Sequence, residues 1–258
     1  MQNDMLRERK NNYISYPKNI SKLLTYKVKY EDIGLKDYKE TWDYQERIFQ
    51  KLVSNKKVSS DLTSTSEEND HGTLIFVEHP HVYTLGKSGS ENNLLLDYIQ
   101  LQTRDALFYR IDRGGDITYH GPGQIVGYPI FDIEKIGISL KEYIHRLEEA
   151  VILTLADFGI PAERLSGATG VWLDTLIPGR TRKICAIGVK ASRYITMHGF
   201  AFNVNTNLEY FNFINPCGYT DKGVTSLEKE IGRKQDFNEV KVILKEKLKE
   251  VFNLIWIN

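Results

Sequence analysis

The chain has 258 residues, of which 41% are hydrophobic and 26% are charged, so it can bury a sizeable core without cross-links. Its 34 basic and 34 acidic residues cancel, which argues against a general nucleic-acid binder because such proteins carry a basic excess. Two cysteines are too few for a disulfide framework, and no apolar run reaches the roughly 18 residues that span a membrane.

The first 26 residues are polar, include acidic residues and lack the apolar stretch typical of a secretory signal. We therefore expect residues 1–26 to form a loosely ordered tail, and we expect a cytoplasmic location without a membrane partner. The remainder, residues 27–258, has no clear linker and no internal repeat, which indicates a single domain.

The first predicted elements lie before residue 80. Apolar residues at helical spacing predict an amphipathic helix over residues 36–53. Residues 54–72 are rich in Ser, Thr, Asn and charged residues, which predicts a polar loop inserted into the domain. A short apolar run at residues 73–78 predicts a buried strand.

Further along the chain, predicted strands and helices are mixed. Residues 125–131 predict a strand in which Pro129 indicates an edge position or a bulge, because proline has no N–H for a central ladder. A capping box from Ser139 to Glu142 begins a helix that stops before Gly159. Short strands are expected at residues 170–174, 184–190 and 199–205, before a last helix capped by Asp236. Without regular βαβ alternation, this mixture predicts an α+β fold with helices packed on a mixed β-sheet.

The segment from Arg113 to Gln124 is unusually rich in residues that suit a ligand wall. Five of its twelve residues are Gly or Pro, and glycine lets a backbone approach a ligand closely. A mere connector has little need for the Arg, Thr, Tyr and His side chains that accompany these glycines. Neither standard nucleotide phosphate motif is present, so we interpret the segment as a wall against a small molecule of another kind.

The two cysteines have different surroundings in the sequence. Cys185 lies in an apolar run that predicts a buried strand. Cys217 lies between Pro216 and Gly218, which could hold a thiol at the end of a rigid loop. By residue type alone, a small buried side chain is the favoured interpretation of Cys217.

A basic run extends over residues 178–193; it includes Lys183 and contains no acidic residue. Such a run is most often a solvated face, but it could also dock an acidic partner. A cation beside a thiol lowers the pKa of that thiol, so a pair of Lys183 and Cys217 would produce a reactive thiolate. His120, His198 and Cys217 do not have the spacing of known zinc motifs, and no metal site is expected.

Four blocks of the sequence, in the expected order, resemble the lipoate-protein ligase B family, the octanoyltransferases of lipoate biosynthesis. The glycine-rich block extends over residues 113–128. The others are residues 76–86, residues 183–188, and a last block made of residues 198–205 and 214–219. The resemblance covers about residues 28–228 and assigns nothing to the tail or to the polar stretch 54–72.

The resemblance implies the catalytic domain shared by lipoate ligases and biotin protein ligases, over residues 27–258. It implies transfer of an octanoyl group from octanoyl-acyl carrier protein to a lysine of lipoyl domains, such as those of 2-oxoacid dehydrogenases and the glycine-cleavage H protein. No cofactor and no nucleic-acid partner are implied. The matching catalytic positions are Cys217 and Lys183, and this reverses the interpretation of Cys217 as a buried apolar residue.

A thioester on Cys217 would divide the transfer into two easier steps. Lys183 would act either as a cation that stabilises the thiolate or as a neutral base, and the sequence leaves both roles open. The expected acyl pocket consists of Arg113, Gly114, Gly115, Asp116, Ile117, Thr118, Tyr119, His120, Ala186, Ile187, Gly188, Gly199, Phe200 and Ala201. Two other functions remain as alternatives, an ATP-dependent lipoate or biotin-type ligase and a noncatalytic lipoyl-binding relative.

Overall fold

The computed structural model describes residues 25–61, 71–215 and 222–258. Three sequence predictions therefore lie wholly or partly outside the described residues: the tail of residues 1–26, residues 62–70 of the polar stretch 54–72, and the loop that carries Cys217. Among the described residues, no helix combines the length and the apolar character that crossing a membrane requires.

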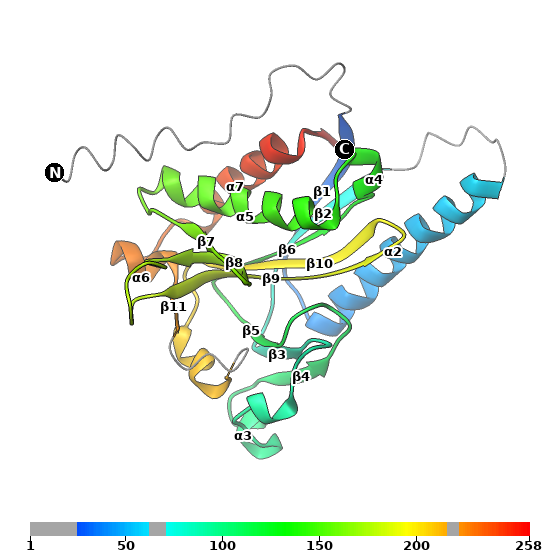
Figure 1. Ribbon diagram of the computed structural model, residues 1–258. Coiled ribbons are helices and arrows are strands. Elements are labelled where there is room, and N and C mark those ends of the chain that lie inside the picture. Colours follow the sequence, from blue (N-terminus) through cyan, green and yellow to red (C-terminus); the bar gives the residue numbers. More distant parts are fainter. Residues whose placement is uncertain (1–24, 62–70, 216–221) are drawn as a thin grey trace.

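A large mixed sheet forms the centre of the fold (Figure 1). Its strand order is β12-β1-β2-β6-β10-β9-β8-β7, and β11 pairs in parallel with β9. Strands β12, β1 and β2 run parallel, whereas the pairs from β2 to β7 are antiparallel. The strands are β1 (Tyr26–Leu35), β2 (Gly72–Glu78), β6 (Gln124–Ile130), β7 (Glu163–Leu165), β8 (Ala168–Leu173), β9 (Arg182–Ser192), β10 (Ile195–Asn203), β11 (Gly223–Val224) and β12 (Leu254–Ile257).

A second, three-stranded sheet lies below the first in Figure 1 and is separate from it. Its order is β4-β3-β5, formed by β3 (Val82–Leu85), β4 (Leu107–Arg110) and β5 (Ile117–His120). The short helix α3 (Tyr98–Gln102) and the 3-10 turns η2 (Glu91–Asn93) and η3 (Leu208–Phe213) accompany it. This small sheet has its own apolar cluster, which includes Tyr83, Leu101 and Tyr119.

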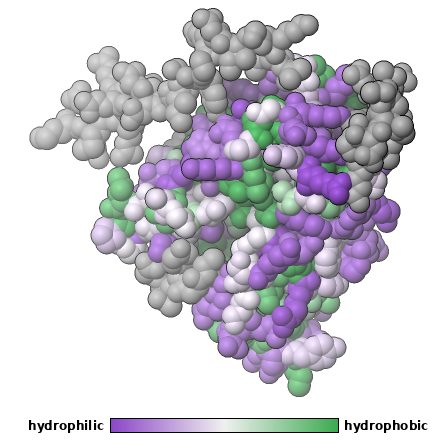
Figure 2. Space-filling model, turned by 45° about the vertical axis from the view of Figure 1, so that its right-hand side comes forward, coloured by the Kyte–Doolittle hydropathy of each residue, from purple (hydrophilic) through white to green (hydrophobic). Residues whose placement is uncertain are grey.

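Helices cover both faces of the large sheet. The helices α5 (Leu140–Asp157) and α7 (Phe237–Phe252) lie together on one face, and their apolar stripes enter the main core. The helix α2 (Tyr38–Asp61) packs Phe49, Leu52 and Val53 against the other face. Figure 2, with the α2 side turned forward, shows a mostly hydrophilic outer surface there. Two short helices, α4 (Ile133–Ile136) and α6 (Leu227–Ile231), complete the described elements.

The predicted α+β class is confirmed, and the predicted strands and the last helix are found close to their expected positions. Ser139 begins α5 by accepting a hydrogen bond from the Glu142 N–H at 3.2 Å. Asp236 caps α7 in the same way, by accepting from the N–H groups of Asn238 and Glu239. Caps of this kind satisfy N–H groups that have no partner within the helix.

The prediction of a loop from residue 54 onward is wrong for residues 54–61, because α2 continues to Asp61. The last turns of α2 extend past the edge of the sheet (Figure 1). Residues 62–70 lie outside the described residues, and residue 72 already begins β2.

Of the two alternatives that Pro129 indicated, an edge position or a bulge, the edge position is wrong, since β6 lies between β2 and β10 in the middle of the sheet. The sheet accommodates the missing N–H by opening the ladder between β6 and β10, whose register pairs stop at Gly127. Opposite Pro129, the His198 N–H donates to Gln45 Oε1 at 3.2 Å, and His198 has a φ of 60°. The Pro129 carbonyl instead accepts from the hydroxyl groups of Tyr143 and Thr196.

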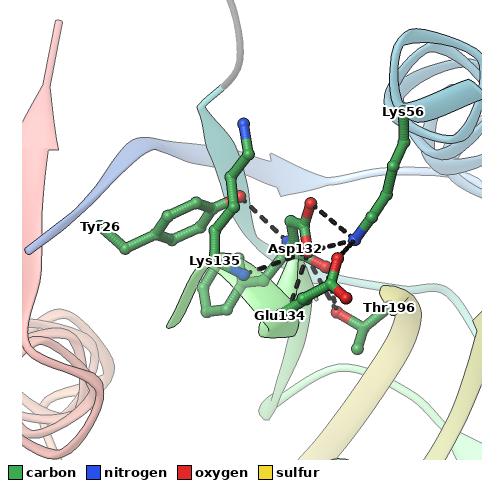
Figure 3. Close-up of polar contacts among 7 residues, drawn as sticks. Tyr26, Lys56, Asp132, Glu134, Lys135 and Thr196 are labelled. Carbon is green, nitrogen blue, oxygen red and sulfur yellow. Dashed lines mark hydrogen bonds and ion pairs between the residues drawn. The ribbon is translucent and has the colours of Figure 1, made fainter. Parts of the chain in front are cut away.

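A polar cluster fastens the far half of α2 to the sheet (Figure 3). Lys56 Nζ lies 2.8 Å from Asp132 Oδ1 and 2.7 Å from Glu134 Oε2. Asp132 is buried and also caps α4, while its N–H donates to the Tyr26 hydroxyl. Burial alone would lower the pKa of Lys56, but its hydrogen bonds to Asp132 and Glu134 more than offset this and raise that pKa.

We expect Asp132→Ala to lower the free energy of unfolding by about 2–4 kcal/mol, because it removes both a helix cap and the partner of a half-buried cation. Asp132→Asn keeps a capping side chain without the charge and should cost about 1–2 kcal/mol. Urea unfolding of the two variants measures both values. Equal losses in the two variants would show that the cap contributes nothing beyond the ion pair to Lys56.

Candidate active site

A cavity of about 460 Å³ lies where the small sheet meets the main sheet. Its walls come from β5 of the small sheet, from β6, β8, β9 and β10 of the main sheet, and from the first residues of α2 and α5. The structure brings all the predicted pocket residues except Tyr119 to this one cavity, and Lys183 also lines it. Residues separated by about ninety positions in the sequence thus share one site.

Tyr119 lies in strand β5 but does not line the cavity, whereas the other three residues of this strand do. Thr118 and His120 line the cavity, whereas the Tyr119 ring stacks on Tyr210 at 4.9 Å between centroids. The Tyr119 hydroxyl lies 2.7 Å from His81 Nδ1. Tyr119 therefore packs in the apolar cluster of the small sheet and does not line the cavity.

The glycines before β5 allow close contacts between backbones. The Gly114 N–H donates to the Val189 carbonyl at 2.9 Å, which joins the segment to strand β9. Gly115 has a φ of 87°, and a Cβ atom on Gly86 would stand 2.3 Å from the Gly115 carbonyl oxygen. A side chain at Gly86 would therefore push this wall out of place.

The Arg113 guanidinium is buried in the same wall. It donates to the Thr84 carbonyl at 2.6 Å and to the Gly114 carbonyl at 3.0 Å. These contacts fix the cation beside the cavity, where burial is the main cause that lowers the pKa of His120 and His198 and the Arg113 charge adds to it.

A line of hydrogen bonds runs across the cavity from β5 to β11. His120 Nδ1 lies 2.8 Å from Gln124 Oε1, and Gln124 Nε2 donates to Asn203 Oδ1 at 2.9 Å. Asn203 Nδ2 then donates to the Thr225 carbonyl at 3.0 Å, and the Thr225 N–H donates to the Lys183 carbonyl at 2.9 Å. Because the Gln124 amide nitrogen is a donor, its oxygen accepts from His120, which sets the Nδ1–H tautomer of that ring.

Two buried histidines beside the cavity are neutral at physiological pH. Burial, together with the charge of His79, lowers the pKa of His120 to about 3. Burial also lowers the pKa of His79 to about 4, although a hydrogen bond to the Lys36 carbonyl opposes this. Tyr38 packs against both rings, so these aromatic groups form a compact, uncharged end of the cavity.

His198 and Asp112 form a second pair at the cavity wall, with His198 Nε2 3.0 Å from Asp112 Oδ1. Hydrogen bonds from His198 and from Lys190 hold the pKa of Asp112 well below its usual range. Burial lowers the pKa of His198 despite this carboxylate. The contact depends on the left-handed backbone at His198, and no local sequence signal marks it.

Lys183 lies on β9 and is partly buried at the cavity wall. Its ammonium lies 4.5 Å from the centroid of the Trp172 ring. The two residues after the undescribed segment, Lys222 and Gly223, also line the cavity. Gly223 and Val224 form β11, whose register partners on β9 are Arg182 and Lys183.

Cys185, the other cysteine, is fully buried as the sequence indicated. Burial raises the pKa of its thiol well above the usual value, although the nearby Lys183 cation opposes this. A thiol that stays protonated and inaccessible cannot serve as a nucleophile.

The basic run does not form one patch. Arg180 and Arg193 lie beyond opposite ends of β9, whose eleven residues span about 35 Å. Arg182 is bound to Asp174 and Glu230 at 2.5 and 2.6 Å. The charge of Arg182 is therefore already paired within the chain.

Other residues of the site were not found from the sequence. They come from elements far apart in the chain, so only the tertiary fold brings them to the cavity, and they include Tyr38, Tyr128, Trp172, His198 and Asn203.

Comparison with curated proteins gives close relatives. An octanoyltransferase of Cytophaga hutchinsonii is 51% identical over 224 residues, which cover 87% of this chain and 92% of the relative. The octanoyltransferase of Parabacteroides distasonis is 53% identical, with 87% and 98% covered. An octanoyltransferase of Porphyromonas gingivalis is 54% identical over 223 residues, but the chain spans only 43% of that relative's length.

Among solved structures, a bipartite lipoate protein ligase of Thermoplasma acidophilum is similar with a TM-score of 0.65 and 13% identity, covering 90% of this chain and 86% of that one. A lipoate-protein ligase A bound with ATP has a TM-score of 0.59 and 14% identity, covering 91% and 90%. These likenesses confirm the predicted lipoate ligase fold. The sequence itself matches a family model over residues 37–249, and the chain thus belongs to the lipoyl protein ligase A/B catalytic domain family.

Proposed function

We propose that this chain is an acyltransferase that moves an octanoyl group from octanoyl-acyl carrier protein to a lysine of a lipoyl domain, in lipoate biosynthesis. The name octanoyltransferase, shared by relatives 51% to 56% identical, supports the octanoyl transfer. The observation that carries the proposal is the single cavity that joins Lys183 to the glycine-rich wall.

In the first half-reaction, the Cys217 thiolate attacks the carbonyl carbon of the octanoyl thioester. The tetrahedral intermediate collapses with loss of the carrier thiolate, which takes up a proton, and the octanoyl group remains on Cys217. The position of β11 supports this role, because Lys222 and Gly223 follow Cys217 closely in the sequence and line the cavity beside Lys183.

In the second half-reaction, the neutral amine of the target lysine attacks the thioester on Cys217. The C–S bond breaks, the amine gives up a proton, and the product is an octanoyl amide with the thiolate restored. Both half-reactions develop negative charge on the carbonyl oxygen, which backbone N–H groups of the cavity wall are suited to stabilise.

The acyl chain would lie along the cavity. Burial of each CH₂ group contributes about 0.8 kcal/mol, so a cavity of limited length favours one range of chain lengths. Ile187, Phe200 and Ala201 line this cavity, and so do Gly188 and Gly199. A Cβ atom on Gly199 would stand 2.1 Å from the Gly127 carbonyl oxygen, so the sheet itself also requires this glycine.

The proposal is tested by incubating the protein with octanoyl-acyl carrier protein and a lipoyl domain, with and without ATP. We expect the intact mass of the lipoyl domain to rise by one octanoyl group without ATP, and we expect Cys217→Ser to abolish the change. Transfer that requires ATP would show a ligase, and no transfer under either condition would show a noncatalytic relative. Cys185→Ser is the matched control and should remain active, because Cys185 is buried in the core.

A further inference from the structure

Strand β9 has an open edge beside the cavity, on the side opposite to β10. Strand β8 pairs with this edge only as far as Cys185, whose register partner is Val171. At the residue before Val171 the backbone of β8 turns away: Gly170 has a φ of 120°, and its N–H donates to Glu148 Oε1 on α5 at 3.0 Å. The ladder between β8 and β9 therefore ends at Cys185.

The same edge of β9 is covered again four residues further along the strand. There the Gly114 N–H donates to the Val189 carbonyl at 2.9 Å, so the glycine-rich wall lies against β9. Over residues 186–188, between these two contacts, none of the strands in the described residues pairs with this edge. Both flanks of the gap line the cavity, residues 113–115 on one side and residues 167–169 on the other. The open edge is therefore part of the cavity wall.

Ile187 presents its backbone groups at this gap. The register between β9 and β10 runs without a shift over residues 185–192, so this part of β9 is a regular strand. In a regular strand, the N–H and C=O groups of every second residue point to the same edge. The Val189 carbonyl points to the open edge, since it accepts from Gly114, and the N–H and C=O of Ile187 consequently point there too. The open edge thus offers a donor and an acceptor side by side, which is the pair that an extended amide matches.

The open edge lies close to the Lys183 side chain. A Cβ atom on Gly170 would stand 3.4 Å from Lys183 Cε and 2.5 Å from the Cys185 carbonyl oxygen, so the stem of the lysine passes the end of the ladder. From Cys185 to Ile187 the strand advances by about 7 Å. A ligand whose reacting group lies beside Lys183 can therefore reach Ile187 with the atoms that follow, within the same cavity.

We propose that the open edge of β9 at Ile187 binds a secondary amide of the arm that carries the octanoyl thioester. This inference rests on the proposed function and adds a subsite for the acyl donor. An acyl carrier protein holds its thioester on a phosphopantetheine arm, in which an amide follows the sulfur after two carbon atoms. The Ile187 N–H donates to the carbonyl of this amide, and the Ile187 carbonyl accepts from its N–H, as an added strand would do. The acceptor lysine does not compete for this subsite, because its alkyl side chain contains no amide.

The test compares two octanoyl donors that differ at one position. S-octanoyl-N-acetylcysteamine contains this amide, and S-octanoyl-2-mercaptoethyl acetate has an ester oxygen in place of the amide N–H. We expect kcat/KM for octanoyl transfer to a lipoyl domain, without ATP, to be about five- to tenfold lower with the ester, because the Ile187 carbonyl then has no donor. Equal reaction of the two donors with free hydroxylamine is the control for the reactivity of the thioester. Equal kcat/KM for both donors would overturn the inference.

Two variants locate the preference for the amide donor, defined as the ratio of the two kcat/KM values. Ile187→Pro removes the N–H at the open edge and leaves the ladder to β10 intact, because that N–H points away from β10. Ile187→Val is the matched control, since it changes the side chain but keeps the N–H. The preference should fall to about one in Ile187→Pro and stay at the wild-type value in Ile187→Val. A preference that persists in Ile187→Pro would place the amide elsewhere and overturn the inference.

A measurement on the wild-type protein decides the question if Ile187→Pro does not fold or if no donor is turned over. The unreactive ketone S-(2-oxononyl)-N-acetylcysteamine, at saturation, should slow hydrogen exchange of the Ile187 amide about tenfold or more, as followed by NMR. Unchanged exchange would overturn the inference. Transfer from octanoyl-acyl carrier protein, measured in parallel, reports on the proposed function separately, since that transfer can be present whether or not the Ile187 amide is protected.

Discussion

Lys183→Met is expected to lower the rate of acyl-enzyme formation by about two to three orders of magnitude, whereas Lys183→Arg should stay within about tenfold of the wild-type rate. Arginine keeps a positive charge and stacks on aromatic rings, so it can occupy the place over Trp172. Because the pKa of arginine lies above 12, it cannot act as the base in place of lysine. The measurement is the single-turnover rate of octanoyl transfer from the carrier protein to the enzyme.

The guanidinium is wider than an ammonium, and Gly170 lies next to the Lys183 side chain, so the arginine variant could be slow only because it packs poorly. A second measurement separates this explanation from the loss of a base. The pH profile of Cys217 alkylation by iodoacetamide should stay close to that of the wild type in Lys183→Arg and move to higher pH in Lys183→Met. An arginine variant that keeps the wild-type alkylation profile but is as slow as the methionine variant would assign Lys183 the role of proton acceptor.

The folded protein is expected to lose about 4 kcal/mol of stability between pH 7 and pH 5 through His79 and His120. Burial lowers the pKa of these residues to about 4 and about 3, below the unfolded value near 6.5. Between those values the unfolded chain binds more protons, so stability falls as the pH decreases from 6.5. Because pH 5 lies about 1.5 units below the unfolded pKa of 6.5, each histidine lowers the free energy of unfolding by about 2 kcal/mol at that pH.

Urea unfolding of the wild type and of His79→Phe at both pH values measures this effect. The variant keeps an aromatic ring next to Tyr38 and His120 but loses two hydrogen bonds, to the Lys36 carbonyl and the Tyr128 hydroxyl. It should therefore be less stable at both pH values, with a decrease between them that is about 2 kcal/mol smaller than in the wild type. Equal decreases in the two proteins would contradict a neutral, buried His79.

Local patterns in the sequence were sufficient for much of the site. Glycines and apolar residues mark the segments around Arg113, Ala186 and Gly199, and the fold brings these segments to one cavity. The assignment of Tyr119 to the pocket was wrong because its ring stacks on Tyr210, which lies far away in the sequence.

The remaining features depend on contacts between distant parts of the chain. The small sheet contains strands of only four residues, and its parallel pairing of β3 with β4 has no local signal. At Pro129, in a central strand, the ladder to β10 is open, and the His198 N–H donates instead to Gln45, far away on α2. Trp172 meets Lys183 only through the register shift between β8 and β9. Residue type and spacing do not report such pairings.

The central claim is that octanoyl transfer proceeds through a thioester on Cys217, with the acyl chain in the cavity beside Lys183. Its most direct test is to mix the protein with octanoyl-acyl carrier protein alone, quench in acid, and locate the added mass by peptide mapping. We predict one octanoyl group on the peptide that contains Cys217, sensitive to hydroxylamine and absent from Cys217→Ser. An unmodified enzyme that still octanoylates a lipoyl domain without ATP, or an octanoyl group on Lys183, would contradict the account.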